Sequence, residues 1–208
     1  MFRKVKDDIY SVGVIDWHRK LFDELIPLPD GTSYNSYFIK GEDKNAIIDT
    51  VEPDFAEDFL DNLDDLGVEK IDYIISNHAE QDHSGSIPHL LKKFPEAEVL
   101  SSKKAKPMLL DLLEIEADKI RVVEEGETVD LGGRTLEFID TPWVHWPETM
   151  STYLKEENIL FPCDFFGSHL ATSDLFVEDH AEVYKAAKRY YAEIMMPFRM
   201  IIKKNLAK

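Results

Sequence analysis

Four side chains of the kinds that bind metals in proteins lie within six residues of one another. They are His78, Glu80, Asp82 and His83, and they directly follow residues 71–75, a mainly apolar run typical of a buried strand. Alternate side chains of an extended loop point the same way, so His78, Glu80 and Asp82 are expected to converge, while His83 is free to serve a second metal. Mixed imidazole and carboxylate ligands suit first-row metals, and oxygen-rich sets favour iron or manganese over zinc. The alternative is a polar loop with incidental histidines.

Two later segments carry further candidate ligands. His145 is flanked by two prolines and two tryptophans within residues 142–147, and a rigid, dry setting is what a metal ligand needs to keep its geometry. The alternative is a histidine caught in an aromatic core. Asp164 follows the apolar residues 159–163, where a carboxylate is costly to bury unless a cation pairs with it. We therefore expect Asp164 at a strand end, where one carboxylate can bridge two ions.

Asp49 and Cys163 invite simpler interpretations. Asp49 ends the apolar run 46–48, and we expect it to orient the ligand loop rather than to bind metal. Cys163 is the sole cysteine, which excludes a disulfide framework and a thiolate cluster. Alternation along a strand directs Cys163 away from Asp164, so it is predicted to be a buried, inert thiol.

Composition restricts the function classes. The chain has 208 residues and a formal net charge of −17, which disfavours nucleic acid and anionic membranes as partners. It has no apolar run long enough to cross a bilayer, and residues 1–8 lack a signal peptide's apolar stretch, so a cytoplasmic location is expected. There is no internal repeat or linker, and we expect a single domain over residues 1–208.

The order of elements predicts an α+β fold. Two blocks of strands are each followed by helices, which indicates two sheets packed face to face with helices outside. Pro197 is expected to kink or split the last helix. The predicted strands are residues 9–14, 36–39, 44–49, 71–75, 99–101, 120–123, 128–131, 135–140, 150–154 and 159–162. The predicted helices are residues 53–66, 87–94, 104–113 and the segment from about residue 179 onwards.

The ligand pattern resembles a known family. A His-x-Glu-x-Asp-His loop, a later isolated His and a strand-terminal Asp resemble the metallo-β-lactamase fold, an αββα four-layer sandwich of two mixed sheets. Glu80, where the hydrolases carry a second His, is similar to the flavodiiron proteins. Residues 21–35, 145–150 and 190–198 are similar to segments of that family, so the resemblance extends over essentially the whole chain.

The resemblance implies a non-haem diiron centre with assigned ligands. One iron would be held by His78, Glu80 and His145. Asp82 would hold the other iron with His83 beside it, and Asp164 would bridge the two. Tyr191 would approach the substrate pocket.

The resemblance also implies a function and marks a difference. Flavodiiron proteins reduce O2 to water or NO to N2O with electrons that reach the irons through FMN, from donors such as rubredoxin. Their last His ligand and their flavodoxin domain have no counterpart here, so we expect no FMN on this chain, poor turnover without an external donor, and a homodimer only as one option. His169 is the best substitute for the missing ligand. The alternatives are an oxygen-binding or sensing diiron protein and a zinc hydrolase, against which Glu80 argues.

Overall fold

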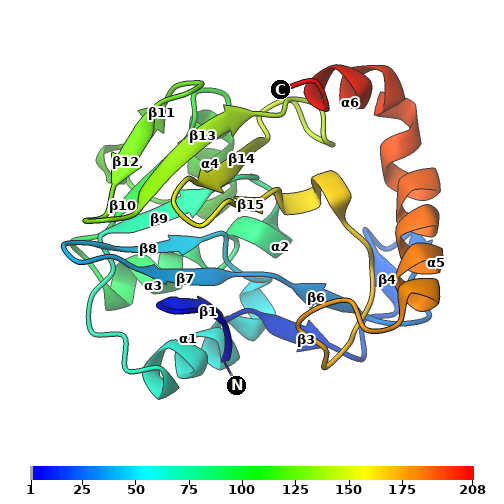
Figure 1. Ribbon diagram of the computed structural model, residues 1–208, viewed down its shortest axis with the longest axis horizontal. Coiled ribbons are helices and arrows are strands. Elements are labelled where there is room, and N and C mark those ends of the chain that lie inside the picture. The colour runs from blue at the N-terminus through cyan, green and yellow to red at the C-terminus, as the bar shows by residue number, and fades with distance from the viewer. Residues whose placement is uncertain (1) are drawn as a thin grey trace.

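The larger of two main sheets forms the base of the fold. The computed structural model describes residues 2–208, and its seven-stranded sheet has the order β1-β2-β7-β8-β9-β10-β11 (Figure 1). The strands are β1 (Arg3–Lys6), β2 (Ile9–Ser11), β7 (Tyr37–Lys40), β8 (Asn45–Ile48), β9 (Tyr73–Ser76), β10 (Glu98–Ser102) and β11 (Ile120–Val123). Pairing is antiparallel from β1 to β8 and parallel from β8 to β11. The carboxyl ends of β8 and β9 therefore lie at the same edge of the sheet.

The second main sheet is antiparallel throughout. It consists of β12 (Thr128–Asp130), β13 (Thr135–Asp140), β14 (Met150–Leu154) and β15 (Ile159–Phe161), paired in that order. Two small hairpin-like pairs complete the strands: β3 (Val14–Asp16) with β6 (Thr32–Tyr34), and β4 (Leu21–Phe22) with β5 (Ile26–Pro27).

The two main sheets pack face to face through one apolar core. Alternate side chains of a strand point to the same face, and here one set from each sheet meets the other. The larger sheet contributes Ile39, Ile48, Ile75 and Leu100, and the smaller contributes Leu136, Phe138, Met150 and Leu154, all of them buried. Burying these faces against each other gives the sandwich its main hydrophobic stabilisation.

Three helices cover the opposite face of the larger sheet. They are α1 (Ala56–Asp65), which continues a 3₁₀ turn η1 (Pro53–Phe55), α3 (Ile87–Lys93) and α4 (Ala105–Leu113). In α1 the buried Ala56, Phe59 and Leu63 follow the helical spacing, and the acidic residues between them face water. This amphipathic pattern explains the helix, and its exposed face carries part of the negative charge.

The C-terminal segment forms an arm beside the sandwich (Figure 1). It runs through α5 (His180–Tyr190), a π-helical turn η4 (Tyr191–Met195), a 3₁₀ turn η5 (Met196–Phe198) and α6 (Arg199–Asn205). Asp179 caps α5 by accepting hydrogen bonds from the backbone N–H groups of Ala181 and Glu182. The arm packs on Val144 and on the β4–β5 hairpin. The predicted break at Pro197 is present, as three changes of helix type (α to π, π to 3₁₀ and 3₁₀ to α) rather than one kink.

The predicted α+β sandwich is confirmed, with corrections of detail. The smaller sheet is antiparallel rather than mixed. The strand predicted over residues 9–14 is two short strands, β2 and β3, and the strands β1, β4, β5 and β6 were not predicted. The remaining short helical pieces are α2 (Gln81–Ser84), η2 (Ala117–Lys119) and η3 (Cys163–Phe166).

Candidate metal centre

Buried hydrogen bonds fix the start of the ligand loop at the end of β9. Asp49, directly after the parallel neighbour β8, accepts hydrogen bonds from the backbone N–H of Asn77 at 2.8 Å and from its Nδ2 at 2.9 Å. The other end of that amide, Oδ1, accepts a hydrogen bond from Thr152 at 2.7 Å. Asp49 thus anchors the loop, and each oxygen of its carboxylate accepts one hydrogen bond from Asn77.

One group of candidate ligands gathers around Glu80. Its Oε2 lies 3.0 Å from Nε2 of His78 and 3.0 Å from Nε2 of His145. Oδ2 of Asp164 lies 3.5 Å and 3.6 Å from the same two nitrogens. One ligand atom from each of these four residues lies within 4.8 Å of the others. Two imidazoles and two carboxylates therefore face one point.

Asp164 also faces a second group. Its other oxygen, Oδ1, lies 3.0 Å from Nε2 of His83, and Oδ2 of Asp82 lies 3.4 Å from the same nitrogen. Asp164 is in the 3₁₀ helix η3, not at the end of a strand as the sequence predicted. That turn directs one carboxylate oxygen to each group, which is the placement of a bridging ligand.

A short helix makes the two groups diverge. Glu80 still has extended backbone, but Gln81 begins the one-turn helix α2. The extended geometry expected for the whole loop therefore holds for His78 and Glu80 and fails at Asp82. The helical turn places Asp82 with His83 in the second group, instead of with His78 in the first.

The electrostatics of the cluster call for cations. Burial lowers the pKa of His78, but its hydrogen bonds with Glu148 and Glu80 outweigh this and raise it to about 10. Burial raises the pKa of Glu80, yet His145 and His78 bring it down to about 2. Burial, with Asp164 and Glu80 nearby, raises the pKa of Asp82 to about 6. A proton on His78 thus balances part of the carboxylate charge, and a metal ion can replace that proton.

The donors fit iron. Nitrogen and carboxylate oxygen are the ligands that non-haem iron takes in proteins, and no thiolate is needed. Oδ1 of Asp82 is buried without a hydrogen-bond partner among the described residues, and such an atom is costly to bury unless a cation satisfies it. The six predicted ligands therefore form two adjoining sets joined by Asp164.

Comparison with known proteins identifies the family. Residues 32–207 match the family model described as ODP family beta lactamase. The chain belongs to this family. It is 38% identical to the flavo-diiron protein FprA2 of Clostridium acetobutylicum, over 98% of this chain and 52% of the relative. It is 39% identical to a protein named nitric oxide reductase of Moorella thermoacetica, over 97% of this chain and 51% of the relative.

Solved structures agree. The rubredoxin oxygen:oxidoreductase from the anaerobe Desulfovibrio gigas superposes with a TM-score of 0.95 at 29% identity, over 100% of this chain and 52% of that one. The flavodiiron resemblance of the sequence is confirmed. The chain spans about half the length of the curated relatives it matches.

Sequence reasoning missed a buried acid in this flavodiiron relative. Oε1 of Glu148 lies 2.7 Å from Nδ1 of His78 and accepts a hydrogen bond from the backbone N–H of Ala79 at 3.1 Å. The Glu148 side chain is fully buried. The available signal was an acid three residues after His145, in a segment already singled out.

The strand alternation used to place Cys163 is absent. Cys163 opens η3 rather than alternating along a strand, and its Sγ lies 3.3 Å from Nδ1 of His83. Burial raises the pKa of its thiol well above the ordinary value. Cys163 is therefore a neutral contact behind a candidate ligand.

The tyrosine that faces the centre is Tyr190, not Tyr191. Tyr191 is 42% exposed, whereas Tyr190 is buried. Tyr190 lines a cavity of about 370 Å³ together with Asp82, His83 and Asp164. The helical phase of α5 brings Tyr190 to the cavity, so it takes the position that the sequence assigned to Tyr191.

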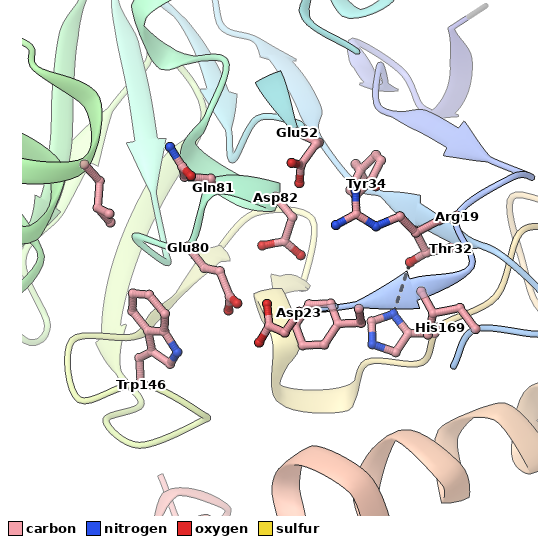
Figure 2. A pocket seen from close by; sticks show the side chains of 13 residues that line it. Arg19, Asp23, Thr32, Tyr34, Glu52, Glu80, Gln81, Asp82, Trp146 and His169 are labelled. Atoms are coloured by element: carbon pink, nitrogen blue, oxygen red, sulfur yellow. Dashed lines mark hydrogen bonds between the residues drawn. The ribbon is translucent and has the colours of Figure 1, made fainter. Parts of the chain in front are cut away.

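A second cavity, of about 250 Å³, is lined by Glu80, Gln81 and Asp82 of the ligand loop. In Figure 2 the carboxylates of Asp23, Glu80 and Asp82 point toward its middle. His169 lines both cavities, with Nδ1 3.2 Å from the Thr32 hydroxyl. Nε2 of His169 is buried and has no partner in the described part of the chain. Two clusters of possible ligands with close ligand atoms occur among residues 2–208, namely His78, Glu80, His145 and Asp164, and Asp49, His83 and Cys163. His169, predicted as a substitute ligand, belongs to neither.

Trp146 packs against the two histidines of the first group. Its ring packs edge-on against His78, with the centroids 5.1 Å apart, and against His145 at 6.3 Å. Trp143 instead stacks on Phe198 at 6.1 Å and is 42% exposed. One of the two tryptophans flanking His145 therefore shields the centre, while the other anchors the C-terminal arm.

Proposed function

We propose that this chain holds a pair of iron ions and reduces O2 to water, NO to N2O, or both. The observation that carries the proposal is the position of Asp164, whose two oxygens face the two ligand groups separately. A site for one metal has no use for this arrangement. The identity of the relatives, named nitric oxide reductase and rubredoxin oxygen:oxidoreductase, supports the same reaction class.

Each candidate ligand has a proposed role. His78, Glu80 and His145 hold one iron. Asp82 and His83 hold the other, and Asp164 bridges both. Three carboxylates favour iron over zinc in these positions. When bound, a ferrous pair supplies electrons to a small diatomic substrate.

The residues around the centre supply shape and protons. The cavity of about 250 Å³ admits small molecules beside Glu80 and Asp82. Burial raises the pKa of Asp23 and of Glu52, both in its wall, so these carboxyl groups hold protons more readily than exposed ones do. Protons are consumed in both reactions, so acidic groups close to the substrate have a use.

The electrons must come from a donor. Reducing O2 to water consumes four electrons and four protons, and joining two NO into N2O and water consumes two of each. We propose that a reduced flavin of a flavodoxin-type domain or rubredoxin delivers them, and that the chain by itself turns over slowly.

None of the helices among residues 2–208 is long and apolar enough to cross a membrane.

An anaerobic NO assay tests the proposal. The iron-loaded chain is mixed with reduced rubredoxin and a reduced flavodoxin as donors, NO loss is followed at an electrode, and N2O is measured by gas chromatography. We expect one N2O for every two NO consumed. An O2 electrode, with catalase added to detect peroxide, tests the second substrate.

The control is Asp164→Asn, which keeps the size of the side chain and removes its charge. It is expected to abolish turnover while the fold persists. Equal rates for the two proteins would contradict the proposal, and so would a loaded chain that retains zinc and hydrolyses thioesters or lactams instead.

A further inference from the structure

Each of two histidines at the centre is supported from behind by a different kind of side chain. His78 has Nε2 toward Glu80, and its Nδ1 lies 2.7 Å from Oε1 of Glu148. His83 has Nε2 toward Asp164, and its Nδ1 lies 3.3 Å from Sγ of Cys163. In both rings, a metal held at Nε2 leaves the proton on Nδ1, so that N–H must donate to the group behind it.

The two supports differ in strength. A carboxylate is a charged acceptor, and charge-assisted hydrogen bonds are about twice as strong as neutral ones. A thiol sulfur is a weak acceptor. Glu148 therefore fixes the ring of His78 and makes it a better electron donor to a metal, whereas Cys163 only orients His83.

The surroundings of Glu148 favour its role as the support of His78. Its side chain is fully buried, and Oε1 also accepts the backbone N–H of Ala79. Its other oxygen, Oε2, is buried without a partner within residues 2–208. Because one of its two oxygens lacks a partner, this buried carboxylate gains when its partner ring becomes more positive. A cation at Nε2 of His78 does this, so metal binding and the Glu148 hydrogen bond reinforce each other.

No stronger acceptor takes the place of Cys163 behind His83. Asp49 has a carboxylate oxygen within 4.8 Å of His83 and Cys163 ligand atoms. In the structure its carboxylate accepts hydrogen bonds from Asn77 and none from His83. The direct contact of Nδ1 of His83 is thus the neutral thiol.

We propose that Glu148 and Cys163 are positioning residues that make the two metal sites unequal. The site of His78, Glu80 and His145 binds its ion first and more tightly, and the site of His83 and Asp82 fills second. This inference rests on the proposed two-metal centre and assigns it an order of loading.

Cobalt titration of the whole chain tests the order. Co²⁺ is added to the metal-free protein, and binding is followed by calorimetry and by the visible bands of cobalt, which report its ligands. The wild type is expected to bind two ions in separate steps. Glu148→Gln should weaken the tighter step by about 10- to 100-fold and leave the weaker step within about threefold. Cys163→Ala should weaken only the second step, and Cys163→Ser, which keeps an acceptor, should restore most of it.

Controls separate positioning from structural damage. Ser102→Ala removes a hydrogen bond from the Ser102 hydroxyl to the backbone carbonyl of Glu148, 2.6 Å long, without touching a histidine. It should leave the ratio of the two steps unchanged. If Glu148→Gln does not fold, Glu148→Asp, which shortens the side chain by one carbon, takes its place, and circular dichroism checks each variant.

The outcomes distinguish the two proposals. A wild type that binds fewer than two cobalt ions would defeat the two-metal centre itself. A wild type that binds two ions, with Glu148→Gln and Cys163→Ala weakening both steps alike or neither, would overturn the unequal positioning and leave the centre intact.

Discussion

The anchor behind the ligand loop predicts a measurable loss of stability. Asp49 accepts two hydrogen bonds from Asn77, at 2.8 and 2.9 Å, in a fully buried position. Hydrogen bonds to a charged group contribute about 1.5–3 kcal/mol each. Two of them amount to about 3 kcal/mol at the lower limit, which is appropriate because burial of the carboxylate is itself unfavourable. Asp49 also has a positive φ of 55°, where alanine costs about 1 kcal/mol more.

Asp49→Ala should therefore lower the free energy of unfolding by about 4 kcal/mol. With a urea dependence of about 2 kcal/mol per molar, the midpoint should fall by about 2 M. Asp49→Asn tolerates the positive φ and keeps an oxygen for the Asn77 backbone N–H. Its NH2 group, however, faces Nδ2 of Asn77. The Asn77 amide cannot rotate by 180° to offer its oxygen instead without losing the hydrogen bond that Oδ1 accepts from Thr152. One of the two hydrogen bonds is therefore lost, which should lower the urea midpoint by about 0.8 M.

Urea unfolding with a chelator present measures this in the metal-free chain, where bound ions do not add stability. Asp61→Asn, on the exposed side of α1, is the control and should leave the midpoint unchanged. Midpoints for both Asp49 variants within about 0.2 M of the wild type would refute the anchoring role. If the hydrogen bonds have this role, the urea midpoint is lowest for Asp49→Ala, intermediate for Asp49→Asn and highest for the wild type.

Three further predictions concern the centre and the core. Asp164→Asn should reduce bound iron from two ions per chain to at most one, measured by elemental analysis, because both groups lose a shared ligand. Glu80→His should raise the ratio of zinc to iron retained from an equimolar mixture, since imidazole replaces a carboxylate; an unchanged ratio would contradict the role given to Glu80. Phe138→Ala, at 1% exposure in the core between the sheets, should cost about 3–5 kcal/mol in urea unfolding. Leu160→Ala, 41% exposed on the same sheet, should cost under about 0.5 kcal/mol, and similar losses would contradict the assigned core.

Residue type and spacing predicted the candidate ligands, and the family resemblance predicted their division into two groups. Residue type and spacing identified His78, Glu80, Asp82 and His83, because few other patterns place such side chains after a strand. The sequence did not reveal that Gln81 starts a helical turn. A single turn is too short to show helical periodicity, and that turn decides which group each candidate ligand joins.

The supports behind the ligands could not be found from local pattern. Glu148 meets His78 across 70 positions of the chain, and such contacts depend on how β9 and the 141–149 loop pack. Cys163 was assigned by alternation along a strand that in fact ends at Phe161. The apolar residues after Pro162 resembled more strand, although proline is a common end point.

The sequence could not decide which of the adjacent Tyr190 and Tyr191 faces the cavity. Tyr190 ends α5, and Tyr191 begins the π-helical turn η4. Only the packing of the arm on Val144 and on the β4–β5 hairpin fixes which ring faces the cavity. Two adjacent tyrosines are not distinguishable without that contact.

The most direct test of the two-iron centre is an anomalous difference map from crystals of the iron-loaded chain, recorded at the iron absorption edge. Two peaks are predicted, one beside His78, Glu80 and His145 and the other beside Asp82 and His83, with the carboxylate of Asp164 between them. A single peak, or density that appears only at the zinc edge, would contradict the proposed centre.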